Sequence, residues 1–279
     1  FAMNLIPGGP FNKEKAGSPA VQKILEERYN LDKPVGQQYL IYMNNLLHGD
    51  WGVSLKNGRD IWTDIWSKFQ VSAKLGGTAA IVAIILGIIL GSIAGLTRNK
   101  WPDRLIVFFT TLGTAIPSFV LASLLLLVFC LKLAWFPVWS SSSHNYVLPV
   151  IALAIYPMAY ITRLTKTSML DALNQDYIRT SRSRGIPTRV IIFSHAFKNA
   201  LIPVLTAIGM YFGGLLAGAT ISETVFSING IGSFLVSSVL QRDYPAIQGS
   251  ILVLATVFAV VNTVVDLLYG LVDPRIKYD

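Results

Sequence analysis

The residues with the clearest capacity for a specific contact lie in one basic stretch, residues 163–198, which contains seven lysine and arginine residues. Within it, Asp176 suits a helix start, because a negative charge is favourable at the positive end of the helix dipole. Gly185 suits the residue just after a helix, where φ is often positive, and Pro187 prevents the helix from continuing. Thr188 suits the cap of a new helix. The pattern predicts two short helices joined at Gly185.

A capped pair of basic helices is a shaped surface, which indicates contact with a protein partner. The simpler interpretation is that the basic residues only orient the chain in a membrane or touch anionic lipid. Orientation needs no more than a few scattered lysines and arginines, so we favour a partner.

Other chemistry is not indicated. The histidines His48, His144 and His195 are scattered and Cys130 is the only cysteine, so we expect no bound metal and no internal disulfide. No Gly-x-x-x-x-Gly-Lys-Ser/Thr sequence occurs, so the chain lacks that ATP-binding loop. We therefore expect no catalytic residues and no cofactor on this chain. We assign the basic excess to orientation and partner contact, not to nucleic acid.

The composition places the basic stretch in a membrane protein. Of 279 residues, 53% are hydrophobic and only 14% are charged, and the mean hydropathy is +0.54. Soluble domains carry roughly 25% charged residues. A membrane-spanning helix needs about 20 apolar residues. Four uncharged stretches reach that length, at residues 75–96, 105–131, 199–222 and 245–265.

A shorter uncharged stretch, residues 147–162, contains Pro149 and Pro157. We interpret it as a fifth span, the alternative being a re-entrant or interfacial segment, because membrane helices tolerate proline when neighbours satisfy the freed carbonyl. The stretches do not alternate apolar and polar residues as barrel strands do. The fold class is therefore predicted to be all-α, a polytopic membrane helix bundle with five complete spans.

The N-terminal residues predict two further units. Residues 1–10 are apolar and then rich in proline and glycine, and we interpret them as the end of a truncated first membrane helix. Residues 11–71 predict a helical extracytoplasmic segment, with helices at 19–29 and 37–47 and with Trp62 and Trp66 at the headgroup level. Residues 72–279 form the expected transmembrane domain, which includes the loop 163–198.

Charge asymmetry predicts the orientation. Residues 97–104, residues 163–198 and the C-terminal tail hold 12 basic residues, whereas the two intervening loops hold only Arg242. Basic residues of short loops normally lie in the cytoplasm. The loop 163–198 and the C-terminus are therefore predicted to be cytoplasmic, in a multi-pass protein of a bacterial-type cell membrane.

Small and polar residues within the spans are candidates for a translocation path. The interpretation in which they only pack helices together remains open, because small residues often mediate helix packing in membranes. The candidates are Thr110, Thr114, Ser118, Met210 and Tyr211.

Motifs along nearly the whole chain resemble the permeases of ATP-binding-cassette importers, most closely the B subunits of oligopeptide and dipeptide permeases. Residues 176–185, followed by 195–203, resemble their "EAA" loop, although Arg179-Thr180-Ser181 stands where the general pattern has Glu-Ala-Ala. Residues 5–10, 49–54 and 222–226, with Gly230 and Gly232, resemble other parts of that branch.

The resemblance implies a helical lever that couples this chain to an ATPase. It implies as partners a second homologous permease, two cytoplasmic ATPase subunits that carry ATP and Mg, an extracytoplasmic substrate-binding protein and the lipid bilayer. It implies peptide uptake. The residues expected at the ATPase contact are Asp176, Tyr177, Arg179, Thr180, Arg182, Arg184 and Gly185.

Two alternatives remain at this point. A permease for nickel, glutathione or another small solute would share the same motifs. An ion-coupled secondary transporter would also be polytopic, but it should show internal repeats and ionisable residues near the bilayer midplane.

Overall fold

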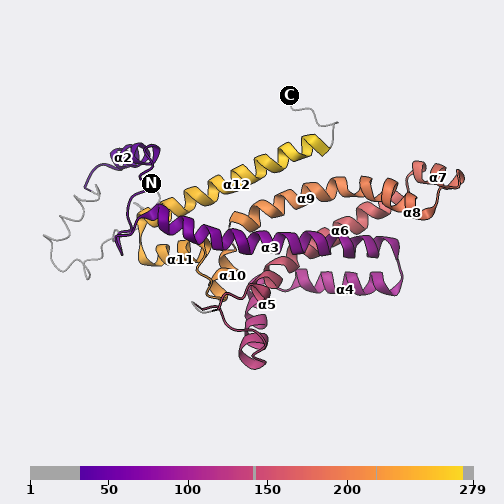
Figure 1. Ribbon diagram of the computed structural model, residues 1–279, viewed down its shortest axis with the longest axis horizontal. Coiled ribbons are helices and arrows are strands. Elements are labelled where there is room, and N and C mark those ends of the chain that lie inside the picture. Colours follow the sequence, from indigo (N-terminus) through magenta and orange to yellow (C-terminus); the bar gives the residue numbers. More distant parts are fainter. Residues whose placement is uncertain (1–31, 141–142, 218, 273–279) are drawn as a thin grey trace.

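The computed structural model describes residues 32–140, 143–217 and 219–272, and within these ranges the protein is built of helices (Figure 1). The α-helices are α2 (Val35–Leu47), α3 (Ile61–Leu96), α4 (Trp101–Ala115), α5 (Ser118–Leu125), α6 (Val147–Leu173), α7 (Asp176–Ser183), α8 (Thr188–Val190), α9 (Phe197–Ala217), α10 (Thr220–Val225), α11 (Ile231–Gln241) and α12 (Tyr244–Val272). Two π-helical turns, η2 (Leu126–Lys132) and η3 (Ile191–Ala196), extend α5 and join α8 to α9.

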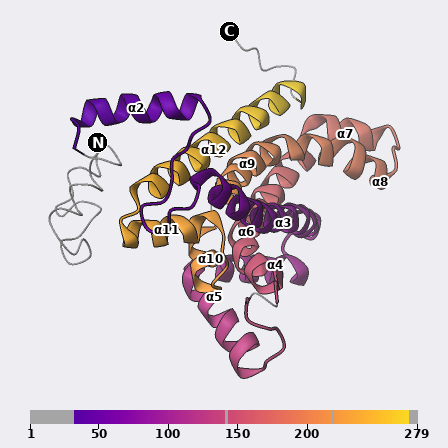
Figure 2. The ribbon, with the colours of Figure 1, turned by 60° about the vertical axis from the view of Figure 1, so that its left-hand side comes forward.

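The long helices α3, α6 and α9 run side by side, with α4 and α12 beside them (Figures 1 and 2). Small residues let α3 and α6 approach closely. Gly87, Gly91 and Gly95 recur every four residues on α3, and a Cβ on Gly91 would lie 2.5 Å from the carbonyl oxygen of Thr162 on α6. This spacing of small residues is a common way for membrane helices to pack.

The two ends of this bundle differ. Figure 1 shows α7 and α8 at one end, which we call the loop end. The start of α3 lies with α11 toward the opposite end, which we call the far end. The helix α9 leads from the loop end toward α10.

Among the described residues, four helices are long and apolar enough to cross a membrane: Ile61–Leu96, Val147–Leu173, Thr188–Gly209 and Tyr244–Val265. Three of them contain the predicted spans 75–96, 147–162 and 245–265, including the proline-containing one. The fourth, Thr188–Gly209, begins before the predicted span 199–222 and overlaps its first half. The all-α bundle is thus confirmed, with a fifth span if the bent pair of helices α4 and α5–η2 counts as one.

The expected span at residues 105–131 is not one straight helix. It is broken into α4 and α5–η2, which meet at an angle of 101°. Ile116 is extended (φ −87°, ψ 125°), as residues before proline usually are, and Pro117 has no N–H to continue the helix. The arm α5–η2 projects away from the bundle in both views (Figures 1 and 2).

The segment before the bundle agrees with the sequence only in part. The expected helix at 37–47 is present as α2, whereas the expected helix at 19–29 and residues 1–10 lie outside the described residues. Helix α3 begins at Ile61 and runs without a break through residue 71, where the sequence placed the end of the extracytoplasmic segment. Asp60 caps it by accepting the N–H of Thr63 (2.8 Å), and hydrogen bonds from Thr63 lower the pKa of the Asp60 carboxyl.

Candidate functional site

Helix α7 is attached to the bundle through one fully buried side chain, Ile178. Ile178 belongs to an apolar cluster whose other buried members come from α6, η3 and α9: Met169, Ala172, Ile191, Ala196 and Ala200. The cluster joins α7 to the ends of two long helices. Through this cluster α7 is therefore connected to both α6 and α9.

The turn after α7 confirms the prediction for Gly185, whose φ is +72°. The N–H of Gly185 donates to the carbonyl of Arg182 (3.0 Å) and the N–H of Ile186 donates to that of Ser181 (3.2 Å). This pair of bonds is a Schellman motif, which satisfies the carbonyls at the helix end. A Cβ on Gly185 would meet nothing within 4 Å, so a larger residue here would cost backbone strain and no collision.

The prediction for Thr188 is wrong. Pro187 holds the cap position and no side chain caps the helix, because Thr188 is already the first helical residue. There is also no separate second short helix: α8 continues through η3 into α9, and Thr188–Gly209 is one apolar helical run. The turn at Gly185 thus links α7 directly to a membrane helix.

The outward face of α7 is polar. Asp176 and Arg179 approach to 3.5 Å, but their side chains are 95% and 77% exposed, so this ion pair contributes little to stability. The Tyr177 hydroxyl accepts a hydrogen bond from the Asn199 side chain (3.0 Å), which ties the face to α9. All seven residues expected at the partner contact are exposed: Asp176, Tyr177, Arg179, Thr180, Arg182, Arg184 and Gly185.

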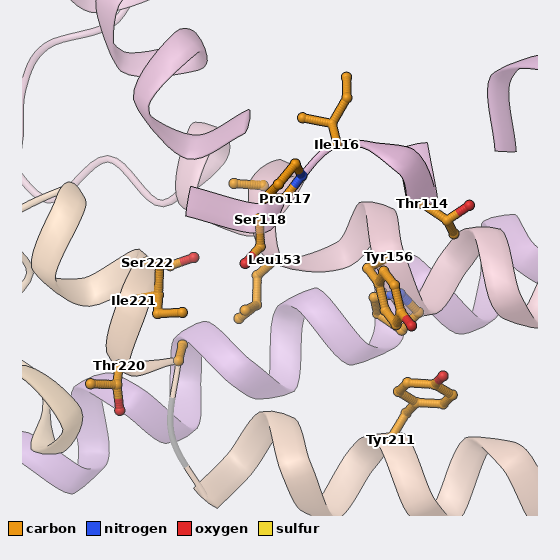
Figure 3. Close-up of a pocket in the computed structure, with 13 residues that line it drawn as sticks. Thr114, Ile116, Pro117, Ser118, Leu153, Tyr156, Tyr211, Thr220, Ile221 and Ser222 are labelled. Atoms are coloured by element: carbon orange, nitrogen blue, oxygen red, sulfur yellow. The ribbon is translucent and has the colours of Figure 1, made fainter. Parts of the chain in front are cut away.

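A cavity of about 570 Å³, which we call the central cavity, lies where the break between α4 and α5 faces α6, α9 and α10 (Figure 3). Three of the five candidate path residues line it: Thr114, Ser118 and Tyr211. Tyr156 on α6 faces Tyr211, with ring centroids 6.4 Å apart. The described residues that line the cavity carry hydroxyl groups and apolar groups but no charge.

The other two candidates do not add to this cavity. Thr110 is buried and donates to the carbonyl of Ile106 (2.9 Å), so its hydroxyl is used within α4. The side chain of Met210 lies outside what the structure describes. Sequence reasoning missed Tyr156, Thr220 and Ser222, which line the cavity. The available sequence signal for Tyr156 was its spacing of four residues from Tyr160, which places two tyrosines on one face of a helix. In the structure both rings lie near the ring of Tyr211.

Helix α10 forms one wall of the cavity and is anchored by Glu223, which is fully buried. Glu223 Oε1 accepts from the Ser72 hydroxyl of α3 (2.6 Å), and Oε2 accepts from the N–H of Ser233 in α11 (2.9 Å). The carboxylate thus serves as a cap for α11. Gly230 makes room for it, because a Cβ there would lie 2.4 Å from the Glu223 carboxyl carbon.

A partly buried ion pair joins helices at the loop end. Lys166 Nζ on α6 lies 2.5 Å from Asp103 Oδ1 on α4, and the N–H of Asn99 donates to Asp103 Oδ2 (3.0 Å). Asp103 therefore links α6 to α4, and α4 leads to Thr114 at the central cavity.

Residues 87–278 match the family described as "Binding-protein-dependent transport system inner membrane component". This chain belongs to that family. The permease is 44% identical to the dipeptide transport system permease protein DppB of Bacillus subtilis over 278 residues, 99% of this chain and 90% of the relative. It is 39% identical to the oligopeptide transport system permease protein OppB of Salmonella typhimurium over 282 residues, 100% of this chain and 92% of the relative. It is 38% identical to the glutathione transport system permease protein GsiC of Escherichia coli (strain K12) over 280 residues, 99% of this chain and 91% of the relative.

A solved structure of the MetNI methionine ABC transporter in inward-facing conformations has a chain with the same fold as the permease. The TM-score is 0.64 at 13% sequence identity, over 75% of this chain and 96% of that chain. This likeness concerns the fold alone. The family match and the permease relatives confirm the resemblance found in the sequence. The chain is a membrane-embedded transport subunit of an ABC importer, and the ion-coupled alternative is set aside.

Proposed function

We propose that this permease forms, with a second homologous permease, the membrane pathway of a peptide importer. Two cytoplasmic ATPase subunits and an extracytoplasmic substrate-binding protein complete the complex. This chain binds no cofactor, and ATP and Mg²⁺ bind to the ATPase subunits. The loop end and the C-terminus face the cytoplasm, in agreement with the basic residues of the loop.

The observation that carries the proposal is the attachment of α7. Its apolar side, through Ile178, is buried against α6 and α9, while its polar side is exposed. A helix attached in this way presents a surface to a partner and transmits displacement to two membrane helices. The residues proposed at the ATPase contact are the seven exposed ones between Asp176 and Gly185.

The mechanism follows from this connection. When the ATPase subunits close on ATP, α7 moves with them and tilts α6 and α9. Tyr156 of α6 and Tyr211 of α9 line the central cavity, so the tilt changes its shape and the side to which it opens. ATP must favour one of the two arrangements, since a ligand shifts an equilibrium only through its different affinity for the two states.

The central cavity supports a peptide substrate. Uncharged hydroxyl groups both donate and accept hydrogen bonds, which suits the amide groups common to all peptides. Nickel is bound by nitrogen, oxygen and sulfur ligands such as histidine, carboxylate and thiolate groups. None of the described residues that line the cavity is histidine, aspartate, glutamate or cysteine. A nickel pathway is therefore less well supported than a peptide pathway.

Substitution at Gly185 tests the lever. Gly185→Val should be strained at φ +72°, whereas Gly185→Asn is a matched control because asparagine tolerates positive φ. In the complete importer reconstituted in liposomes, we expect the valine variant to hydrolyse ATP with little peptide uptake. The asparagine variant should retain coupled uptake. Coupled uptake at the parental rate in the valine variant would contradict the lever.

A further inference from the structure

A second cavity, of about 490 Å³, lies toward the far end of the bundle beside the first turns of α3. It is lined by two lysines of α3, Lys68 and Lys74, by His144 and Asn229 from loops, and by Trp139 and Tyr146. No carboxylate belongs to the described residues that line it. The nearest acidic residue on the same helix, Asp64, precedes Lys68 by one turn.

Neutral groups hold the two ammonium groups at the cavity. Lys68 Nζ donates to the side-chain oxygen of Asn229 (2.9 Å) and lies 5.1 Å from the ring centroid of Phe234. Lys74 Nζ lies 4.9 Å from the ring centroid of Tyr146. An ammonium group has three N–H donors. The Asn229 bond uses only one donor of Lys68, so the site can still donate to an anion.

Aromatic side chains line one wall of this cavity and pack against one another. The Trp139 ring meets the rings of His144 and Tyr146 edge-on, each at 4.9 Å between centroids. The cavity combines aromatic rings with polar and charged groups, which can both surround a small molecule and fix its orientation.

One apolar cluster borders both cavities, and we call it the dividing cluster. Its buried members are Leu75, Ala122, Leu148, Ala152, Ala219, Phe226 and Ile228. Ala152 and Ala219 also line the central cavity, whereas Val71, Trp139 and Tyr146 pack against the cluster and line the far-end cavity. Both cavities therefore border the same apolar cluster.

We propose that the far-end cavity binds the terminal carboxylate of an incoming peptide before the peptide passes the dividing cluster. This rests on the proposed peptide uptake. Every unmodified linear peptide has one terminal carboxylate whatever its side chains, and hydrogen bonds between ammonium and carboxylate groups are stronger than neutral ones. The uncharged central cavity offers no such partner. Lys68 and Lys74 thus select the shared charge of peptides at the entry of the path.

The test uses the complete reconstituted importer with trialanine as substrate and with the binding protein titrated. We expect Lys68→Gln with Lys74→Gln to lower the maximal uptake rate about tenfold, equivalent to about 1.4 kcal/mol, with an unchanged half-saturating concentration of binding protein. Arginine at both positions should restore uptake. Lys132→Gln, which removes an exposed lysine of the projecting arm outside this cavity, should leave uptake unchanged.

The following results would overturn the site. An uptake rate in the double glutamine variant equal to that of the parent would show that the two lysines bind nothing that peptide transport requires. A raised half-saturating concentration of binding protein would show that they dock that protein instead. An equal loss with Lys132→Gln would show a general charge effect. If the parental importer takes up no trialanine, the peptide function itself fails, and the site fails with it.

Discussion

The short helices α7 and α10 lie at opposite ends of α9 and are anchored in opposite ways. Helix α7 buries an apolar residue, Ile178, and exposes its charges. Helix α10 buries a carboxylate, Glu223, and presents Ile221 and Ser222 to the central cavity. Charge is therefore exposed on α7, where we propose that a partner binds, and buried on α10, where it fixes the cavity wall.

This difference indicates different freedom of movement. Apolar contact has no preferred direction, so Ile178 can stay buried while α7, α6 and α9 change their tilt together. Hydrogen bonds weaken steeply when they are misaligned, so the bonds of Glu223 to Ser72 and Ser233 hold α10 in one position against α3 and α11. We infer that α7 moves with its partner, whereas α10 is the fixed wall against which α6 and α9 move.

Removal of the carboxylate should have the largest effect. Glu223→Ala leaves the buried hydroxyl of Ser72 and the N–H of Ser233 without their acceptor, at a cost of about 1–3 kcal/mol for each group. We expect a clear fall in the thermal unfolding temperature of the purified importer. The control Thr224→Ala removes a neighbouring exposed hydroxyl that bonds within α10. It should change the unfolding temperature little. Equal unfolding temperatures for the two variants would show that Glu223 does not anchor α10.

Truncation of the apolar anchor should have a somewhat smaller effect on stability but should abolish coupling. Ile178→Ala creates a cavity beneath α7. Such a truncation of a buried side chain costs about 2–5 kcal/mol of folding free energy, and we expect the lower half of this range because the cluster lies at the periphery of the bundle. We expect this variant, reconstituted in liposomes, to hydrolyse ATP without peptide uptake. That result would strengthen the contrast between α7, which moves with its partner, and α10, which stays fixed. Retained coupling would mean that α7 transmits movement through another contact.

Loss of the partly buried ion pair should have the smallest of the three effects. Asp103→Asn removes the charge that faces Lys166, and breaking a fully buried pair costs about 3–5 kcal/mol. The Lys166 side chain is 22% exposed, so water reduces this cost. We expect a small fall in unfolding temperature together with slower uptake, because α4 no longer follows α6. Unchanged uptake would show that α4 receives no movement from the loop end.

The sequence was sufficient for the features that depend on local chemistry. Uncharged length predicted the membrane helices, and the positive φ of Gly185 followed from its place between Arg184 and Pro187. The sequence could not distinguish a proline that a helix tolerates from one that breaks it. Pro157 lies inside α6, whereas α4 ends before Pro117. The difference depends on neighbouring helices, which one segment does not specify.

The central cavity was predictable only in part for the same reason. Thr114, Ser118 and Tyr211 were candidates because they are polar residues within spans. Thr220 and Ser222 reach the cavity because Glu223 fixes α10 beside it, through Ser72, which is 151 residues away in the chain. No local pattern reveals a contact over that separation.

The most direct test of the lever is the distance across the central cavity in the complete importer. Spin labels at Thr114→Cys and Ile221→Cys, in a Cys130→Ser background, report α4 relative to α10. We expect a non-hydrolysable ATP analogue to change this distance in the parent and not in the strained Gly185→Val variant. The same change in both, or no change in the parent, would contradict transmission from α7 to the cavity.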